Sequence, residues 1–280
     1  MYKILEKRVL NANTKMMLID APHVAKRAKP GQFIMLRVDE DGERIPLTIA
    51  SADVDKGTIM IIFQEVGATT KKLGELEEGE CLHDFAGPLG KASELEGLKK
   101  VAVVGGGLGC AIAYPQAKAL HEIGAKVDLI AGFRSKDLII LADEMKAAST
   151  NLYIVTDDGS NGHKALVTDV LKERIEAGEQ YDAVIAIGPM IMMKFVAETT
   201  RPYGIKTIVS MNSTMVDGTG MCGGCRLTVG GETKFACVDG PDFDAHLVDF
   251  DEAIRRSGMY KQQESEAVAH HCRLQDQEVG

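Results

Sequence analysis

Residues 101–111 read Val-Ala-Val-Val-Gly-Gly-Gly-Leu-Gly-Cys-Ala, and this stretch decides how the central part of the chain folds. The apolar residues predict a short buried strand, the glycines a tight turn, and residues 110–123 a helix. A strand, a glycine turn and a helix start form a unit that binds phosphate in open parallel sheets. Measured against the spacing G-x-G-x-x-G, however, Cys110 occupies the third glycine position. A turn that only packs the helix on the strand therefore stays open as an alternative.

Downstream of this turn, short apolar strands alternate with helical stretches as far as residue 210. Strands are predicted at residues 126–131, 152–155, 183–187 and 207–209, with helices between them. This alternation predicts a parallel α/β sheet covered on both faces. Gly159 and Gly188 follow two of these strands, at the edge where open sheets bind ligands.

Upstream of the turn, residues 1–98 are rich in short β-type runs separated by turn signals. Such spacing predicts an antiparallel barrel or sandwich. Arg44 stands close to the hydroxyl residue Thr48, and an arginine in such a setting can hold a pyrophosphate and reach a flavin edge. Residues 67–73 offer backbone N–H groups and hydroxyls suited to phosphate. An ordinary strand end and loop is the alternative for both stretches.

The segment after residue 210 is rich in Gly, Asp and Cys and follows the spacing D-x4-C-x2-C-x11-C, from Asp217 to Cys237. Plant-type [2Fe-2S] proteins use C-x4-C-x2-C and a distant fourth cysteine, so the match holds if Asp217 takes the first position. Structural zinc is an alternative, because C-x2-C also occurs in zinc knuckles. Three buried cysteines without metal are a second alternative. A hairpin is predicted at residues 226–235, and a short acidic helix at 242–256.

The chain has 280 residues, of which 45% are hydrophobic and 26% charged, which is typical of a globular protein. Its net charge of −9 argues against nonspecific nucleic-acid binding, which needs a basic surface. The sequence contains no apolar run long enough for a signal peptide or a membrane span, so we expect no membrane contact and a cytoplasmic location. There the six cysteines would stay reduced, and the three between residues 222 and 237 indicate a metal site.

The order of these segments resembles the ferredoxin–NADP reductase superfamily. Within it, the chain resembles the electron-transfer subunit of type B dihydroorotate dehydrogenase. It resembles most strongly the small subunit of the electron-bifurcating NADH-dependent reduced ferredoxin:NADP oxidoreductases. The resemblance covers about residues 2–260 and is most specific in residues 215–225 and 235–241. The dihydroorotate family has cysteine at the position of Asp217, whereas the bifurcating family has aspartate there, as this chain does.

The resemblance implies a β + α/β fold class with an N-terminal antiparallel FAD-binding β-barrel (residues 1–98). A parallel-sheet NAD(P)-binding α/β domain (99–210), a small C-terminal [2Fe-2S] module (211–260) and a polar tail (261–280) follow. It implies FAD contacts at Arg44, Pro46, Leu47, Thr48, Gly67 and Thr70. It implies NAD(H) contacts at Gly105, Gly106, Gly107, Leu108, Gly109, Arg134, Asp157 and Asp158. The cluster ligands it implies are Asp217, Cys222, Cys225 and Cys237, and no catalytic residue is assigned.

The resemblance implies an NAD(P)H-linked oxidoreductase subunit that exchanges hydride with NAD(H) at FAD and relays electrons through the cluster. The implied partner is a larger subunit, forming a heterodimer, that carries another flavin and [4Fe-4S] clusters and binds NADP(H). Ferredoxin is the implied electron partner of the complex. Two alternatives stay open: the electron-transfer subunit of a dihydroorotate dehydrogenase, and a non-catalytic redox-sensing protein. Preference for NAD or NADP is also open, because Arg134 suits either a ribose or a 2′-phosphate.

Overall fold

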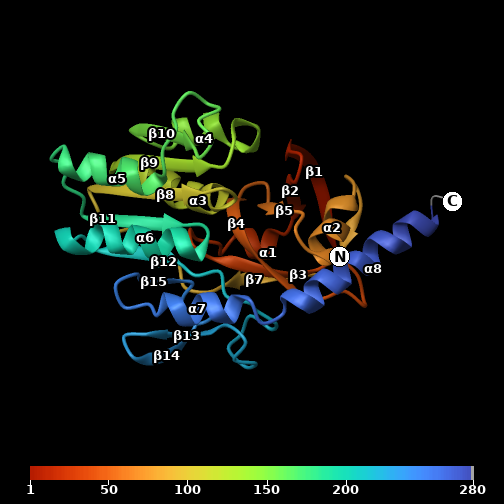
Figure 1. Ribbon diagram of the computed structural model, residues 1–280. Helices are drawn as coiled ribbons and strands as arrows, with labels where there is room; N and C mark the ends of the chain where they lie inside the picture. Colours follow the sequence, from red (N-terminus) through yellow and green to blue (C-terminus); the bar gives the residue numbers. More distant parts are fainter. Residues whose placement is uncertain (279–280) are drawn as a thin grey trace.

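A computed structural model describes the backbone of residues 1–278 and the side chains of residues 1–270. The chain forms a barrel-like antiparallel sheet beside an α/β sheet, and a small C-terminal module lies beneath both (Figure 1). The predicted architecture is confirmed in all three parts. The predicted residue borders between the parts stay predictions.

The N-terminal part is a seven-stranded antiparallel sheet with the order β6-β1-β2-β5-β4-β3-β7. Its strands alternate between buried and more exposed residues: Ile59, Ile61 and Phe63 on one strand are completely buried. Three hydrogen-bonded pairs carry register shifts, which bend the sheet toward closure. The elements are β1 (Tyr2–Asn11), β2 (Thr14–Asp20), α1 (Pro22–Ala25), β3 (Phe33–Arg37), β4 (Ile45–Asp53), β5 (Thr58–Gln64), α2 (Ala68–Glu75), β6 (Cys81–Leu82) and β7 (Asp84–Leu89).

The second part is a six-stranded sheet with the order β10-β9-β8-β11-β12-β15. Alternate residues of its central strand face opposite layers: Val101 and Val103 pack under α3 and α4, whereas Ala102 and Val104 pack under α5 and α6. The chain leaves β8 toward β9 and later returns to β11 on the other side, so the topological switch point lies between β8 and β11. The elements are β8 (Lys100–Gly106), α3 (Gly109–Glu122), β9 (Lys126–Phe133), α4 (Ala142–Ala147), β10 (Asn151–Thr156), α5 (Val167–Glu176), β11 (Ala183–Ile187), α6 (Met190–Thr200) and β12 (Thr207–Ser210).

The C-terminal module departs from the sequence prediction in two places. Residues 242–244 form β15 (Asp242–Asp244), which pairs antiparallel with β12 and makes the sheet mixed. The acidic helix is therefore shorter than predicted and becomes α7 (Phe250–Ser257). The predicted hairpin is present as β13 (Arg226–Val229) and β14 (Glu232–Phe235). A three-residue strand carries too little periodic pattern to be told from a helix start.

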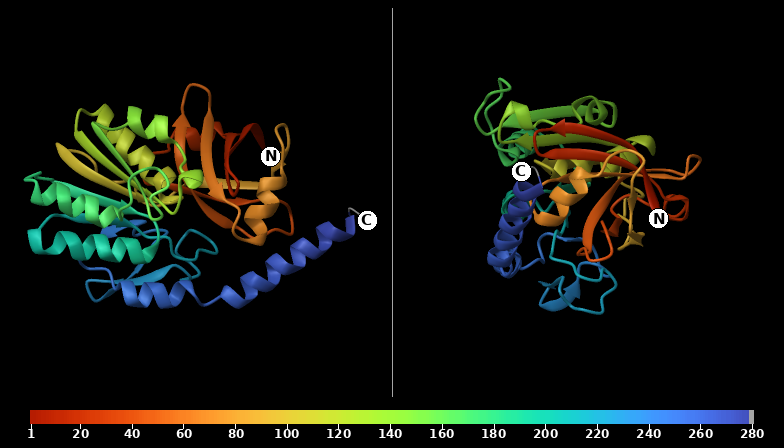
Figure 2. Two further views of the ribbon diagram at one scale, coloured as in Figure 1. Left: turned by 45° about the horizontal axis from the view of Figure 1, so that its top comes forward. Right: turned by 90° about the vertical axis from the view of Figure 1, so that its right-hand side faces the viewer.

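The segment predicted only as a polar tail contains helix α8 (Lys261–Glu278). This helix leaves the C-terminal module and runs along the barrel side of the molecule, where it lies near α2 (Figures 1 and 2). Through residue 278, the structure contains no helix with the length and apolar character that crossing a membrane requires.

One apolar core joins all three parts of the chain. Phe33 and Met35 come from the barrel, and they pack in the same cluster as Val104. Val104 belongs to the six-stranded sheet, which we name the nucleotide sheet after the ligand that the sequence predicts for it. Cys225 and Cys237 of the C-terminal module belong to this cluster too, and each is no more than 2% exposed. Burial of such a core makes relative motion of the parts costly.

A buried polar contact also lies where the three parts meet. The Asp242 carboxylate of β15 accepts a hydrogen bond of 2.6 Å from Ser93 Oγ, at the end of the barrel segment. Gln116 of α3 is completely buried, and its Nε2 lies 3.4 Å from the same carboxylate oxygen. Asp242 Oδ1 and Gln116 Oε1 are buried without a hydrogen-bond partner among the described residues. Burial raises the pKa of Asp242, and hydrogen bonds from Ser93 and Ser210 oppose that rise.

We predict that Asp242→Asn makes the stability of the fold less dependent on pH. Because its pKa is raised on folding, the Asp242 carboxyl contributes stability below its unfolded pKa of about 4. That contribution is lost as the pH rises through the folded pKa. The difference in melting temperature between Asp242→Asn and wild type should therefore shift in favour of the variant as the pH rises from 5 to 7.5. An equal difference at both pH values would contradict the prediction, and Asp244→Asn, on the same strand but exposed, is the control.

Candidate functional site

The residues expected to bind flavin lie at one end of the barrel. β4 and β5 are antiparallel neighbours, so the start of β4 lies beside the end of β5 and the loop to α2. Arg44 precedes β4, and its side chain is 52% exposed. Its Nη2 lies 3.4 Å from Asp84 Oδ2, which also pairs with Arg37 Nε at 3.0 Å. The Arg44 guanidinium is held at the barrel rim and keeps donors available for an anion.

The three residues at the start of β4 do not share a face. Pro46 and Thr48 are cross-strand partners of Met35 and Phe33, so they stand on the face toward the shared core. Leu47 points the other way and packs on the barrel interior. Only backbone atoms of Leu47 are therefore available to a ligand on the outer face.

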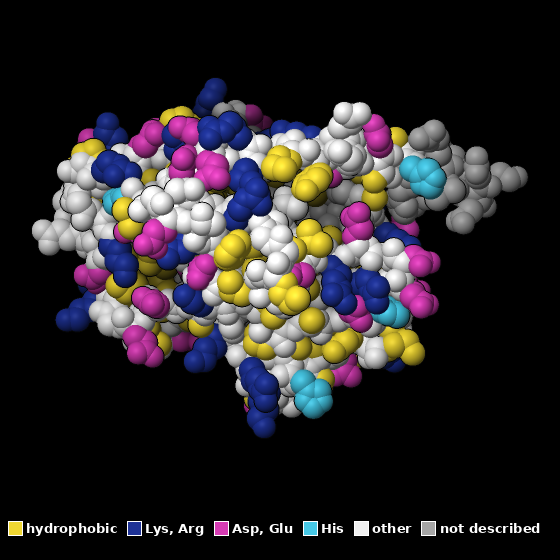
Figure 3. Space-filling model, turned by 90° about the horizontal axis from the view of Figure 1, so that it is seen from below, with side chains coloured by type: hydrophobic (Ala, Val, Ile, Leu, Met, Phe, Trp, Pro, Cys, Tyr) yellow, Lys and Arg dark blue, Asp and Glu magenta, His cyan; other side chains and the backbone are white. Residues whose placement is uncertain are grey.

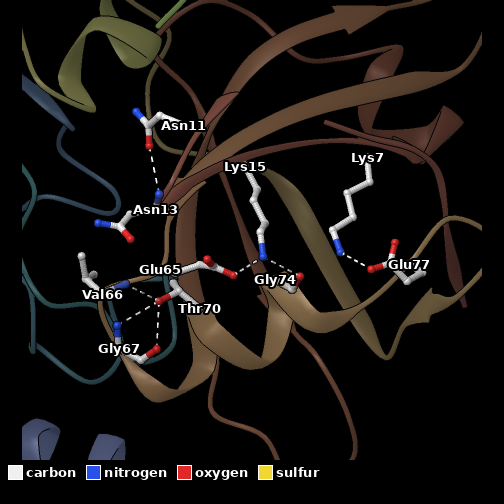
Figure 4. Close-up of polar contacts among 10 residues, drawn as sticks. All are labelled: Lys7, Asn11, Asn13, Lys15, Glu65, Val66, Gly67, Thr70, Gly74 and Glu77. Carbon is white, nitrogen blue, oxygen red and sulfur yellow. Dashed lines mark hydrogen bonds and ion pairs between the residues drawn. The ribbon is translucent and has the colours of Figure 1, made fainter. Parts of the chain in front are cut away.

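Gly67 and Thr70 form the N-terminal cap of α2 (Figure 4). The Thr70 hydroxyl accepts hydrogen bonds from the N–H groups of Val66 at 3.1 Å and Gly67 at 3.0 Å, and it donates to the Gly67 carbonyl at 3.0 Å. These contacts fix the loop from β5 so that the first amides of the helix point outward. Thr70 thus shapes the start of α2, and its own hydroxyl is engaged in the cap.

An ion pair that sequence analysis missed anchors α2 to the barrel (Figure 4). Lys15 Nζ of β2 lies 2.5 Å from Glu65 Oε1 and 3.0 Å from the Gly74 carbonyl oxygen. Both charged side chains are only 18% exposed. A Cβ on Gly74 would stand 1.7 Å from Glu65 Oε1, so a larger residue there would force the Glu65 side chain to move and disturb the ion pair.

The glycine turn after β8 lies at the switch point of the nucleotide sheet. A Cβ on Gly109 would stand 2.2 Å from the Ile187 carbonyl oxygen of β11, and one on Gly106 would stand 2.4 Å from Met192 Sδ. Gly105 is closed off by Cys110, which fills the space that a third glycine would leave. Packing therefore explains three of the four glycines in this turn.

Gly107 is the exception in the same turn. A Cβ there would meet nothing within 4 Å, and its φ of +56° favours glycine. Gly107 therefore leaves room at the start of α3, where helix amides attract phosphate. Its own N–H donates to the Gly132 carbonyl at 2.8 Å, and the Leu108 side chain packs against the core. Burial raises the pKa of the Cys110 thiol to about 12, which makes this cysteine a packing residue.

Arg134 and the pair Asp157 and Asp158 follow β9 and β10, and all three are exposed. Backbone bonds tie the two strand ends together: Asp157 N–H donates to the Phe133 carbonyl at 3.0 Å, and Asp158 N–H donates to the Arg134 carbonyl at 3.2 Å. Asp158 accepts hydrogen bonds from the hydroxyl and N–H of Ser160, and these lower its pKa. The Asp158 carboxylate is therefore engaged within its own loop. Arg134 and Asp157 are the better candidates for contact with a nucleotide.

The four expected cluster ligands stand in two pairs. Cys225 Sγ lies 3.3 Å from Cys237 Sγ, and Cys222 Sγ lies 3.5 Å from Asp217 Oδ1. The described cysteines are all free, and a disulfide sulfur pair would be about 2.05 Å apart. Two thiolates that share one tetrahedral metal, about 2.3 Å from each sulfur, stand about 3.7 Å apart. Each pair is thus close to the spacing that one metal requires.

The arrangement of these pairs fits two metal centres better than one. Among the described residues, no three His, Cys, Asp or Glu side chains lie close enough to hold a single ion. A zinc knuckle needs four ligands around one ion, whereas each iron of a [2Fe-2S] cluster takes two protein ligands. The donor set of three thiols and one carboxylate therefore fits a [2Fe-2S] cluster, with the four residues as its proposed ligands.

Asp217 also braces the loop that surrounds it. Its Oδ2 accepts hydrogen bonds from the N–H groups of Met221 and Cys222, both at 3.1 Å, and Thr219 N–H donates to Oδ1 at 3.0 Å. The Thr219 N–H makes the largest contribution to lowering the pKa of Asp217, which keeps the carboxylate charged. Burial raises the pKa of Cys237 to about 12, so metal binding must displace its proton.

The loop that carries Asp217 and Cys222 rests directly on the barrel. Gly218 has a φ of +77°, and a Cβ there would stand 2.6 Å from Met35 Cγ of β3. Two arginines support the other side of the loop: Arg226 donates to the Gly223 carbonyl and Arg256 to the Gly224 carbonyl, both at 3.3 Å. Sequence analysis missed Met35 and Arg256, because neither belongs to a motif.

Two family models match the chain. The oxidoreductase FAD-binding domain matches residues 1–93. The iron–sulfur cluster binding domain of dihydroorotate dehydrogenase B matches residues 212–249. The flavin and iron–sulfur character expected of the first and third parts is confirmed.

Curated relatives match most of the chain. An uncharacterised protein from Clostridium beijerinckii is 55% identical, with 95% of this chain and 93% of the relative covered. A homologue of the dihydroorotate dehydrogenase B electron-transfer subunit from Thermotoga maritima is 47% identical, with 88% and 86% covered. The corresponding electron-transfer subunit of Streptococcus pneumoniae is 36% identical, with 77% and 85% covered.

A solved structure of an NADH-dependent reduced ferredoxin–NADP oxidoreductase, studied for flavin-based electron bifurcation, superposes with a TM-score of 0.91. It is 42% identical and covers 96% of this chain and 97% of its own. The ferredoxin reductase of carbazole 1,9a-dioxygenase superposes with a TM-score of 0.61 at 17% identity, covering 73% and 64%. At that identity the likeness shows the fold alone.

We predict that Gly109→Ala weakens both the fold and nucleotide binding. The new methyl group would meet the Ile187 carbonyl, which is backbone and cannot turn away. Such overpacking typically costs about 1–3 kcal/mol, measured as the free energy of unfolding, and it would tilt α3 away from the switch point. Gly258→Ala is the matched control, because its Cβ has only ordinary contacts. Equal stability and NADH affinity for the two variants would contradict the prediction.

A second prediction separates ligation by Asp217 from bracing. Asp217→Asn keeps an oxygen that can accept from the loop N–H groups, but a neutral amide is a poor iron ligand. We expect Asp217→Asn to lose most of its iron and sulfide, and Asp217→Cys to keep the cluster with a changed absorption spectrum. Full iron content in Asp217→Asn with an unchanged electron paramagnetic resonance spectrum would show that Asp217 only braces the loop. Asp239→Asn, in the same module, is the control.

Proposed function

We propose an electron-transfer route for this chain, which belongs to the family of dihydroorotate dehydrogenase B electron-transfer subunits and their homologues. It is an oxidoreductase subunit that exchanges hydride with NAD(H) at FAD and relays single electrons through a [2Fe-2S] cluster. The observation that carries this proposal is the apolar core that Met35 of the barrel shares with Cys225 and Cys237. That core sets the proposed flavin face and the proposed cluster against each other.

The residues of the chain have separate roles in this proposal. Arg44 and the cap of α2 bind the anionic part of FAD, while Pro46 and Thr48 lie along its ring. Gly107, Leu108 and Arg134 hold NAD(H) at the switch point, and Asp157 contributes a further polar contact. Asp158 keeps the loop after β10 in shape. When bound, a flavin can take a hydride and release electrons singly, which an iron–sulfur cluster requires.

We further propose that the partner is a larger subunit of an electron-bifurcating NADH-dependent ferredoxin:NADP oxidoreductase. Full-length similarity to the solved oxidoreductase and aspartate at position 217 support this assignment. In the proposal the partner carries another flavin and [4Fe-4S] clusters and binds NADP(H), and ferredoxin is the electron partner of the complex. The names of several relatives favour a dihydroorotate dehydrogenase as the second candidate.

A cytoplasmic location is part of the proposal. The three cysteine ligands must be free thiols before metal binds, and such thiols persist in a reducing compartment. The described cysteines are free, which is consistent with that setting.

The electron route can be tested by an anaerobic titration of the purified chain with NADH. We expect the flavin absorption to bleach first, followed by the spectrum of a reduced [2Fe-2S] cluster. Asp217→Ala should leave flavin bleaching intact and abolish the cluster signal. A chain without flavin absorption, or a flavin that NADH does not bleach, would favour the non-catalytic sensor instead.

The partner can be identified by purification of the complex from the native host, with analysis of flavin, iron and sulfide. A large subunit with additional flavin and iron–sulfur clusters would support the bifurcating enzyme. A subunit that oxidises dihydroorotate would support the second candidate and contradict the first.

A further inference from the structure

A cavity of about 210 Å³ lies behind the cluster loop, between that loop, helices α6 and α7, and the turn that follows α7. Of the four proposed ligands only Cys222 lines it, so the cavity adjoins the ligand set at that one residue. Its polar lining is Ser213, Thr214, Arg226, Arg256, Ser257 and Tyr260.

The charge in this wall is positive and uncompensated. Among the described residues that line the cavity there are two arginines and no Asp or Glu. Arg226 and Arg256 donate to the carbonyls of Gly223 and Gly224, each at 3.3 Å. Both arginines line the wall of this one cavity. Like charges so placed repel, and a shared anion would relieve the repulsion.

Nearby carboxylates are committed elsewhere. Glu252 of α7 accepts from Thr228 N–H at 3.1 Å, and Asp239 accepts from Phe235 N–H at 2.7 Å. Asp217 accepts from the N–H groups of its own loop. The other carboxylate of α7 is Asp251, which pairs with Lys194 at 2.8 Å. None of them lines the cavity.

We propose that this cavity is a binding site for a small oxyanion, a phosphate or carboxylate group, held by Arg226 and Arg256. Guanidinium forks match both groups in geometry and charge. The hydroxyls of Ser213 and Thr214 supply further donors. The volume suits a small anion, since sites for drug-sized ligands measure about 300–1,000 Å³.

The site borders both the cluster loop and the surface. Val216, Met259 and Tyr260 line it and are each about half exposed or more. Figure 3 shows hydrophobic side chains gathered on the underside of the molecule, the side on which the C-terminal module lies. An anion bound beside Cys222 adds negative charge next to the cluster and should lower its midpoint potential. This last consequence rests on the proposed function, whereas anion binding itself does not.

The experiment is calorimetric titration of the FAD-loaded full-length chain with inorganic phosphate, and separately with succinate, at constant ionic strength. We expect one saturable binding event that weakens roughly 10-fold to 100-fold in Arg256→Gln and in Arg226→Gln. Arg255→Gln, on the same helix outside the cavity, should bind as wild type does. Arg226 is exposed, so its variant keeps the test valid if Arg256→Gln does not fold.

Absence of saturable binding for both anions in wild type would overturn the proposal. So would binding that is unchanged in both Arg226→Gln and Arg256→Gln, because it would locate the anion at another site. Iron and flavin content measured on the same samples separates this failure from failure of the proposed electron route.

Discussion

The arrangement of the whole molecule depends on one apolar contact, in which Met35 and Phe33 of the barrel pack with Cys225 and Cys237 of the C-terminal module. These side chains are nearly inaccessible to water, and residues of helices α5 and α6 complete the same core. Separating the parts would expose this apolar surface at about 25 cal/mol per Å². The three proposed cofactor sites are therefore held in fixed positions by packing rather than by flexible linkers.

The same constraint explains several local choices in the sequence. Gly218 permits the cluster loop to approach Met35, and Gly109 permits α3 to approach β11. β15 extends the nucleotide sheet with a strand from the C-terminal module, so that the module is anchored by backbone hydrogen bonds as well as by packing. Asp242 on this strand contacts Ser93 of the barrel segment. Each of these contacts joins parts of the chain that are distant in sequence.

Sequence patterns predicted the elements whose periodicity is local. The strands and helices of the nucleotide sheet, the hairpin of β13 and β14, and the spacing of Asp217 and the three cysteines could all be read in this way. Features that depend on distant partners could not. The antiparallel β15, the inward orientation of Leu47 and the bracing by Arg256 each require a neighbour that only the folded chain supplies. Periodicity also left α8 unpredicted, because the helix is polar all round.

The central claim is that Asp217 is a ligand of one iron of the cluster, and the close contact between Asp217 and Cys222 supports it. Mössbauer spectroscopy of the purified chain enriched in iron-57 tests it most directly. For the oxidised cluster, the account predicts two inequivalent iron sites of equal intensity, one with all-sulfur ligation and one with an oxygen donor, that become alike in Asp217→Cys. A single type of iron site in the wild-type chain would contradict it.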